Sequence, residues 1–402
     1  MVIRVGILMQ ATRRWMGGVV YIQNLIKAIA TLPSDVKSQL ELHLIISPDS
    51  EPEFYQGLIP LVSSIHTVDF LNREIGNKLR WKVTQVFPWL RGKLLTAHHI
   101  ASQIQFDFFY PIMGKYEVTW GFENRMAAWI PDFQHRYLPN LFSTHELDIR
   151  ERNFQFLADR APMIVFSSQA ALADFQRFYP TSTAQLRVLK FRTIPEPDWY
   201  TVDPIAVQNN YQLPDRFFLV SNQFWLHKNH RLVIEAFHLL KQELIQPIVV
   251  CTGSLHDYRC PGYGDELLHQ IHAYQLESQF HFLGLVPRLD QIQLMRRALA
   301  VIQPSLFEGW STVVEDARVL GKTILLSDLP VHQEQDPPYA HYFRRHSADD
   351  LAQTLKTLLP DLREGPNLVA EADARYLHQE QCQMYAQDFL NLVQQNLALA
   401  GN

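Results

Sequence analysis

The 402-residue sequence has few cysteines and no long apolar run. Its three cysteines, Cys251, Cys260 and Cys382, cannot all pair and lack metal-ligand spacing, which excludes a disulfide framework and favours a reducing compartment. No apolar run approaches the roughly 18 residues that cross a bilayer. The N-terminal segment MVIRVGILMQ is typical of a short strand, not of a secretory signal. These absences predict a soluble cytoplasmic protein.

Other missing features exclude classes of function. The net charge of -5 argues against nucleic acid as a main partner. No G-x-G-x-x-G follows the first apolar segment, which argues against a nicotinamide dehydrogenase. Because no cysteine and histidine cluster has ligand spacing and no D-x-D motif follows a predicted strand, we expect neither a metal nor another cofactor.

The composition instead supports large buried cores, since 47% of the residues are hydrophobic and only 19% are charged. Short apolar runs alternate with helix-period segments, a pattern that predicts parallel sheets with helices on both faces. Strands are predicted at 3–9, 42–47, 106–111, 127–131, 163–168, 186–191, 217–221, 248–253, 280–284, 299–304 and 323–327. Helices are predicted at 19–31, 169–178, 229–243, 265–276, 289–298, 312–320, 348–359 and 369–399.

Two such strand and helix series meet at 191–204, a segment with three prolines that we interpret as a linker. The predicted fold class is therefore α/β, with two doubly wound Rossmann-like domains facing each other across a cleft. The domains are expected at 1–195 and 196–370, and a C-terminal helix at 371–402 is expected to cross back to the first domain. In such sheets ligands bind outside the carboxyl ends of the strands, so function is sought in the loops there.

The loop between a predicted strand and helix at 303–322, QPSLFEGWSTVVEDARVLGK, carries two glutamates seven residues apart. A helix start offers free N–H donors and a positive dipole, and a glycine lets a ligand approach the main chain. We therefore expect a phosphate or sugar hydroxyl to dock on the N–H groups of Gly309, Trp310, Ser311 and Thr312. Glu308 and Glu315 can accept hydrogen bonds from hydroxyl groups.

The two glutamates differ in how well a purely structural role explains them. Thr312 to Glu315 matches a capping box, so Glu315 could simply close its own helix. Glu308 has no capping role at a strand end, and burying an idle carboxylate would cost several kcal/mol, or roughly 1–3 if partly paired. Glu308 is the stronger functional candidate.

The segment PSLFEGWSTVVEDARVLGKTILLSDLPVHQEQ resembles the donor-site signature of glycosyltransferase family 4 (group 1 type), whose members are retaining GT-B transferases. The similarity extends over nearly the whole chain and is strongest in the second half. It implies that Glu308 binds the transferred sugar and Glu315 the nucleotide ribose. It also implies an acceptor-side domain at 1–195 and a domain at 196–370 that binds the nucleotide sugar.

The segment LVSNQFWLHKNHRLVIEAF (219–237) resembles the family's strand, loop and helix with diphosphate-binding cations. Lys228 stands where the family has its lysine, although a solvated loop cation is the alternative interpretation. The family's usual arginine falls on Gln223, so one positive charge is missing. Possible substitutes are Arg13, Arg14, Arg192, His227 and His230.

In the first half, Gly17 and Gly18 open a helix after the first strand, as the family has facing the donor diphosphate. Asp132 and His135 follow the strand at 127–131, in the region where the family carries a histidine near the transferred sugar. Alternatively, Gly17 and Gly18 could belong to an ordinary strand-to-helix turn, and Asp132 and His135 could be ordinary polar loop residues. His332 is more typical of a structural residue. Segment 71–93 is basic and aromatic, which suits a lipid-linked or anionic acceptor, peripheral membrane contact, or only a packed helix.

Together these features predict a retaining hexosyltransferase, which uses a nucleotide diphosphate sugar and a glycan or lipid-linked acceptor in polysaccharide or cell-envelope glycan synthesis. The resemblance implies a front-face mechanism in which the donor phosphate deprotonates the acceptor, and the site supplies electrostatic stabilisation. We expect the protein to lie in the cytoplasm or at the inner face of the membrane. Two alternatives stay open: a sugar-nucleotide epimerase on the same fold, and a non-catalytic sugar-nucleotide-binding protein.

Overall fold

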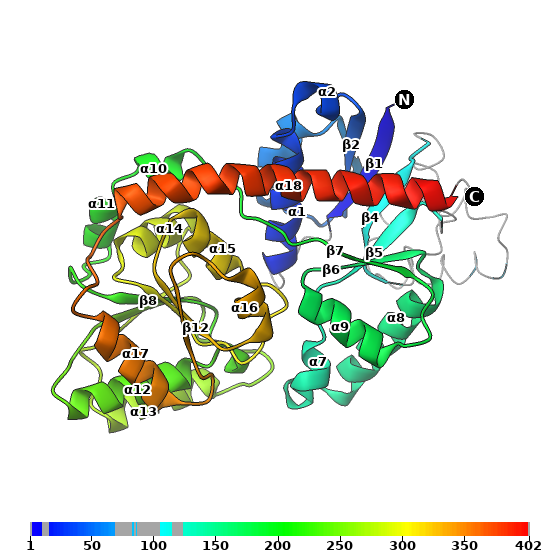
Figure 1. The fold of residues 1–402 in the computed structure, drawn as a ribbon. Helices are drawn as coiled ribbons and strands as arrows, with labels where there is room; N and C mark the ends of the chain where they lie inside the picture. Colours follow the sequence, from blue (N-terminus) through cyan, green and yellow to red (C-terminus); the bar gives the residue numbers. More distant parts are fainter. Residues whose placement is uncertain are drawn as a thin grey trace. The chain divides into compact units, whose positions relative to one another are not determined.

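The computed structural model describes residues 2–9, 16–68, 83, 86, 105–114 and 124–400. By their contacts these residues form two units. The first comprises 1–133, 144–194 and 380–402, and the second comprises 134–143 and 195–379. Each unit contains one parallel sheet with helices packed on it, which confirms the predicted α/β fold class (Figure 1).

The first unit has a seven-stranded parallel sheet in the order β3-β2-β1-β4-β5-β6-β7. Its strands are β1 (Ile3–Met9), β2 (Leu40–Ile46), β3 (Ser64–Thr67), β4 (Phe108–Ile112), β5 (Met126–Ile130), β6 (Met163–Phe166) and β7 (Gln185–Val188). Its main helices are α1 (Met16–Ala30), α8 (Thr144–Arg160) and α9 (Gln169–Phe178). Residues of α8 and α9 form one buried cluster with side chains from β1, β2 and β4 to β6.

The second unit has a six-stranded parallel sheet in the order β10-β9-β8-β11-β12-β13. Its strands are β8 (Phe218–Ser221), β9 (Val249–Thr252), β10 (Phe280–Gly284), β11 (Val301–Gln303), β12 (Ile324–Ser327) and β13 (Ala340–Phe343). Its helices include α10 (Asp198–Thr201), α11 (Pro204–Asn210), α12 (His230–Gln242), α13 (Tyr263–Ala273), α14 (Arg288–Arg297), α15 (Thr312–Val319), α16 (Pro330–Gln335) and α17 (Ala348–Leu358).

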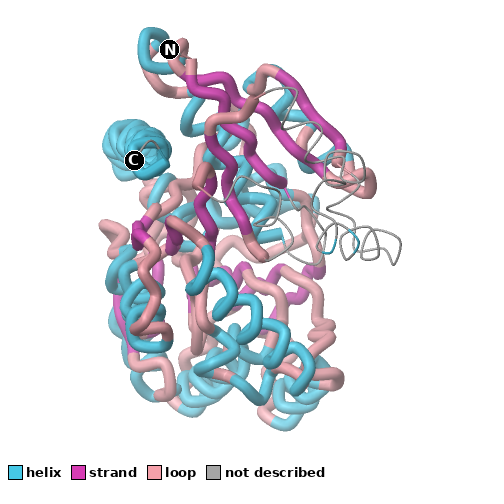
Figure 2. Tube along the Cα trace, turned by 90° about the vertical axis from the view of Figure 1, so that its right-hand side faces the viewer, coloured by secondary structure: helices cyan, strands magenta, loops and turns pink. Residues whose placement is uncertain are grey.

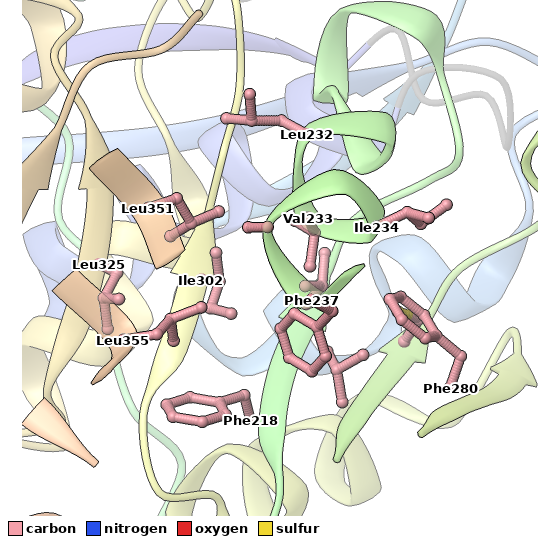
Figure 3. Close-up of a cluster of buried hydrophobic side chains, with 14 of the residues drawn as sticks. Phe218, Leu232, Val233, Ile234, Phe237, Phe280, Ile302, Leu325, Leu351 and Leu355 are labelled. Carbon is pink, nitrogen blue, oxygen red and sulfur yellow. The ribbon is translucent and has the colours of Figure 1, made fainter. Parts of the chain in front are cut away.

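Alternate side chains of the second sheet point into two different cores, because successive residues of a strand face opposite sides. Phe218 and Val220 of β8 pack with α12, α13 and α17 in one cluster, part of which is drawn in Figure 3. Leu219, between them, packs with α11, α14 and α15 in the other. The central strands β8, β9, β11 and β12 are therefore buried on both faces. Figure 2 gives a second view of the helices and strands along the chain.

The long C-terminal helix α18 (Leu368–Ala400) contributes to both units, with residues up to Gln379 in the second and those from Glu380 in the first. In the second unit Arg296 makes a bidentate ion pair with Glu371 of this helix, at 2.7 and 3.0 Å. In the first unit Asn396 donates to the carbonyl of Met126, at 3.1 Å. Both units thus hold this helix by buried polar contacts.

Candidate active site

The candidate site lies at the carboxyl ends of β8 and β11, the central neighbours of the second sheet. Strand order runs outward from this pair in opposite directions, to β9 and β10 on one side and to β12 and β13 on the other. Loops after such a pair leave toward opposite faces and open a crevice, which is where doubly wound sheets bind ligands. Lys228 follows β8, and Glu308 follows β11.

Hydrogen bonds hold the loop after β8 to the loops after the two neighbouring strands, β9 and β11. The N–H of Leu226 donates to the buried carboxylate of Asp257, at 3.0 Å. Asn229 has a left-handed backbone, with φ of 57°, and its side chain donates to the carbonyl of Pro304 at 3.1 Å. The N–H of Leu306 donates to the carbonyl of His227 at 2.8 Å. These contacts fix the short 3-10 helix η7 (Leu226–Lys228) against the loop after β11.

Lys228 and Glu308 form an ion pair with 2.6 Å between Nζ and Oε1, and their side chains are only 15% and 9% exposed. The same Glu308 oxygen accepts from Gln303 Nε2 at 2.8 Å and from Ser305 Oγ at 2.7 Å. A buried charge is tolerated when it is paired and hydrogen-bonded, and both conditions hold here. The structure therefore brings together the two residues with the strongest predicted roles.

The predicted row of main-chain donors is shorter than expected. Ser311 is the N-cap of α15, and its N–H donates to Gln335 Oε1 at 3.1 Å. Gln335 also donates from Nε2 to the carbonyl of Ser311 at 3.0 Å, so both backbone groups of Ser311 are occupied. Ser311 N–H is thus not an open donor, contrary to the prediction. Within the described chain, the N–H groups of Gly309 and Thr312 meet no acceptor.

Glu315 is fully buried in α15, and a capping box does not explain it. The helix has its N-cap at Ser311, so Thr312 is the first helical residue instead of the cap. Glu315 Oε1 accepts from Gln335 Nε2 at 3.0 Å, and Oε2 pairs with Arg318 at 3.3 Å. Glu315 thus joins α15 to α16, and its binding of a ribose stays a prediction.

The histidines near Lys228 are neutral at pH 7 and cannot replace the missing arginine charge. Burial, helped by Lys228 and Arg259, holds the pKa of His227 well below its usual range. Burial, and to a lesser extent the charge of Lys228, lowers the pKa of His230 to about 3. The ring of His230 stacks on that of Phe224, with 4.0 Å between the ring centroids. His227 and His230 are therefore excluded as cations. Arg13 and Arg14 lie outside the described residues.

His332 is a fully buried residue of α16, in agreement with the structural interpretation of this residue. Its Nδ1 lies 2.9 Å from the carbonyl of Ser327, so Nδ1 carries the proton. Burial lowers the pKa of His332 to about 4, although the charge of Glu308 acts in the opposite direction. A neutral imidazole consequently lies near the Lys228 and Glu308 pair.

Gln223 has a structural contact where the family's arginine would carry charge. Its Oε1 accepts from the N–H of Ser254 at 2.8 Å, which joins the loops after β8 and β9. The loops approach closely because Gly253 has φ of 115° and lies against the backbone of Asn222. The amide thus holds two loops of the site together.

Replacing Gln223 with arginine should lower thermal stability and weaken binding of UDP and GDP, because arginine cannot accept from Ser254 N–H. A buried donor left without a partner costs about 1–3 kcal/mol, and the half-buried Ser254 N–H should cost an amount at the lower end of that range. Gln223→Glu keeps the acceptor oxygen and is the matched control: it should stay stable but bind the diphosphates more weakly through repulsion. Unchanged melting temperature with tighter diphosphate binding in Gln223→Arg, measured by calorimetry, would contradict this interpretation.

Gly253→Ala should destabilise the protein, because the new Cβ would lie 2.2 Å from the carbonyl oxygen of Asn222. Gly262 has a similar positive φ of 92° but open space around the same atom, so Gly262→Ala measures backbone strain alone. We expect Gly253→Ala to cost roughly 1–3 kcal/mol more than Gly262→Ala in chemical denaturation, the usual range for overpacking. Equal losses would show that the close approach does not matter.

The candidates from the first half of the sequence follow strands of the first sheet. Gly17 is exposed and Gly18 is buried in the first turn of α1. Asp132 is half-buried after β5, and His135 is buried in the short helix α7 (Gln134–Tyr137), whose residues group with the second unit. Their roles near a donor or acceptor stay predictions. Segment 71–93 lies outside the described residues, except for residues 83 and 86.

Among the described residues, no group of three histidine, cysteine, aspartate or glutamate side chains could hold a metal ion. No described helix is both long and apolar enough to span a membrane. Separately, sequence reasoning missed Asn222, Gln303 and Gln335, although the first two are polar residues at the ends of apolar strands. That pattern is the signal that could have identified them.

The sequence was compared with protein families and with curated proteins. Residues 203–372 match the family model described as glycosyl transferases group 1. The serotype-specific mannosyltransferase WbdA of Escherichia coli is 26% identical over 211 residues, which cover 50% of this chain and 25% of WbdA. The chain thus spans about a quarter of the length of the curated relatives it matches.

Solved structures share the fold along nearly the whole chain. Anabaena Alr3699/HepE, in complex with UDP and glucose, has a TM-score of 0.66 at 17% identity, covering 98% of this chain and 100% of HepE. A glycosyltransferase from Rickettsia africae has a TM-score of 0.69 at 11% identity, covering 98% and 99%. The match over residues 203–372 agrees with the resemblance to group 1 glycosyltransferases that the sequence predicts.

Proposed function

We propose that this protein is a retaining hexosyltransferase that moves a sugar from a nucleoside diphosphate sugar to a glycan or lipid-linked acceptor. The observation that carries the proposal is the ion pair of Lys228 and Glu308 beyond the carboxyl ends of β8 and β11, with 2.6 Å between nitrogen and oxygen. Its cation suits a departing diphosphate, and its carboxylate suits the hydroxyl groups of a sugar. The family match over 203–372 supports it.

Each group in and around this ion pair has a separate role in sugar transfer. Lys228 stabilises negative charge on the leaving diphosphate, and the N–H groups of Gly309 and Thr312 add donors beside it. Glu308 orients the sugar for cleavage of its bond to the phosphate oxygen. The donor phosphate takes the proton of the acceptor hydroxyl while the new glycosidic bond forms on the same face, so the anomeric configuration is retained. No separate general base is required.

We further propose the class of donor and the setting of the reaction. HepE was solved with UDP and glucose, and WbdA is named a mannosyltransferase, so UDP-glucose and GDP-mannose are the first donors to examine. We propose a glycan or lipid-linked acceptor in polysaccharide or cell-envelope synthesis as the second substrate. We place the reaction in the cytoplasm or at the inner membrane face, with segment 71–93 as a peripheral contact, and without a metal or other cofactor.

The test combines binding and turnover with the full chain. UDP, GDP, UDP-glucose and GDP-mannose are screened for a rise in melting temperature, since a ligand that binds the folded state stabilises it by mass action. The stabilising donor is then incubated with glycan acceptors, and the anomeric configuration of the product is read by NMR. A product of inverted configuration would refute retention. Release of epimerised donor without acceptor would favour an epimerase, and binding without turnover a non-catalytic protein.

A further inference from the structure

Gln303 is a polar residue in an otherwise apolar strand. It ends β11, whose other residues are Val301 and Ile302, and it is fully buried. Its Nε2 donates to Glu308 Oε1 at 2.8 Å, and its Oε1 accepts from Asn222 Nδ2, also at 2.8 Å. Asn222 directly follows β8, the strand next to β11, and is itself buried. A buried amide chain therefore links β8 to Glu308 through Gln303.

This chain has a fixed direction. Turning the Gln303 amide over would place its NH₂ against the NH₂ of Asn222 and its carbonyl oxygen against the Glu308 carboxylate. Both contacts would then be repulsive. The Glu308 carboxylate, which can only accept, therefore sets the direction of the Gln303 amide, and Asn222 donates to the remaining Gln303 oxygen. Ser305 supplies another donor to the same carboxylate oxygen, at 2.7 Å.

All three donors, Lys228, Gln303 and Ser305, bind Oε1 of Glu308. The other oxygen, Oε2, has no partner in the described part of the chain, and the Glu308 side chain keeps 9% of its exposure. One oxygen is anchored and the other is available. That asymmetry is what a carboxylate needs if it is to present a single acceptor in a fixed direction.

We propose that Gln303, held by Asn222, is a positioning residue that orients Glu308 so that Oε2 accepts a hydroxyl of the transferred sugar. This deepens the proposed function and rests on it. When Lys228 turns toward the diphosphate, Glu308 loses its cationic partner. Without other hydrogen bonds, the long Glu308 side chain would then be free to rotate. Gln303 and Ser305 keep their donors on Oε1 and hold the rotamer through the reaction.

The decisive variant is Gln303→Glu, which keeps the shape but removes the donor. Two carboxylates at hydrogen-bond distance share one proton at low pH, and repel each other once that proton is lost. Among the described residues, Lys228 of η7 pairs with Glu308, and the charges of Glu308, Lys228 and Arg345 all act on His332 of α16. Burial lowers the pKa of His332 to about 4, so this histidine is neutral over the range tested. The shared proton therefore decides whether residue 303 can donate.

Turnover of UDP-glucose or GDP-mannose by Gln303→Glu should consequently fall roughly 10- to 100-fold at pH 8, the scale of a slightly misplaced group. It should recover toward wild type as the pH is lowered to about 5–6, with the loss in kcat and little change in KM. Gln293→Glu is the matched control, since Gln293 is equally buried, accepts from Arg296 at 2.9 Å and lies in α14. It should show no such recovery.

A second readout does not depend on turnover. The folded variant binds the shared proton more tightly than the unfolded chain, so its stabilising effect is present at low pH and lost as pH rises. The melting temperature of Gln303→Glu relative to wild type should therefore fall between pH 5 and pH 8. If the difference in melting temperature between Gln303→Glu and wild type does not change with pH, the proposed contact between residue 303 and Glu308 is wrong.

The two readouts separate the possible failures. A pH-dependent melting temperature with wild-type kcat at pH 8 would show that Gln303 is only structural, which overturns the positioning role. A loss of kcat that does not recover at low pH would overturn it as well. Absence of turnover and of donor binding in the wild-type protein would instead refute the proposed function on which this inference rests.

Discussion

Glu308→Gln should reduce sugar transfer by roughly 100-fold or more while leaving the fold intact, a loss of about 2.7 kcal/mol of transition-state stabilisation. The glutamine oxygen can still accept from Lys228, Gln303 and Ser305, which all bind one oxygen of Glu308. The other oxygen becomes an NH₂ group, which cannot accept a sugar hydroxyl. The effect should therefore appear in kcat more than in melting temperature.

Turnover of the donor that the thermal-shift screen selects gives the measurement. Glu266→Gln is a suitable control, because Glu266 is an exposed residue of α13 that pairs with Arg231 at 2.7 Å. It should behave like the wild type. A folded Glu308→Gln variant with near wild-type turnover would remove Glu308 from the active site.

Lys228→Ala should weaken binding of UDP and GDP far more than binding of UMP and GMP. A hydrogen bond to a charged group contributes about 1.5–3 kcal/mol, so the dissociation constant of the diphosphates should rise roughly 10- to 150-fold. The monophosphates lack the distal phosphate that Lys228 is proposed to meet, and their binding should change little. Isothermal titration calorimetry on the four nucleotides measures the difference.

The control for this experiment is Lys356→Ala, which removes an exposed lysine of α17 that pairs with Glu243. Its nucleotide affinities should equal those of the wild type. Equal losses for diphosphates and monophosphates in Lys228→Ala would mean that Lys228 does not face the distal phosphate, and that its ion pair with Glu308 is a structural feature of the two loops.

The fold was largely predictable because its strands are buried on both faces and read as short apolar runs. Strands 3–9 and 280–284 and helix 169–178 have the predicted bounds. The strands β3 and β13 were missed since neither is an apolar run: SIHT is half-buried, and two residues of AHYF are exposed. Helix α8 was missed because charged residues dominate its sequence.

Sequence reasoning could select single polar residues in loops as candidates, but it could not identify contacts between segments far apart in the sequence. Lys228 and Glu308 each stand out in their own loop, but Asn222 and Gln303 are 81 positions apart and touch only because β8 and β11 are neighbours. The capping box at Glu315 failed for a local reason, since the helix takes Ser311 as its cap, one residue earlier than the pattern requires.

The most direct test of the central claim is a crystal structure of the full chain with UDP-glucose or GDP-mannose, whichever stabilises it. The claim is that the crevice between β8 and β11 binds the donor through Lys228 and Glu308. It predicts Lys228 Nζ at hydrogen-bond distance, about 2.7–3.2 Å, from a distal phosphate oxygen, and Glu308 Oε2 at the same range from a sugar hydroxyl. A donor bound elsewhere, with the ion pair of Lys228 and Glu308 undisturbed, would contradict it.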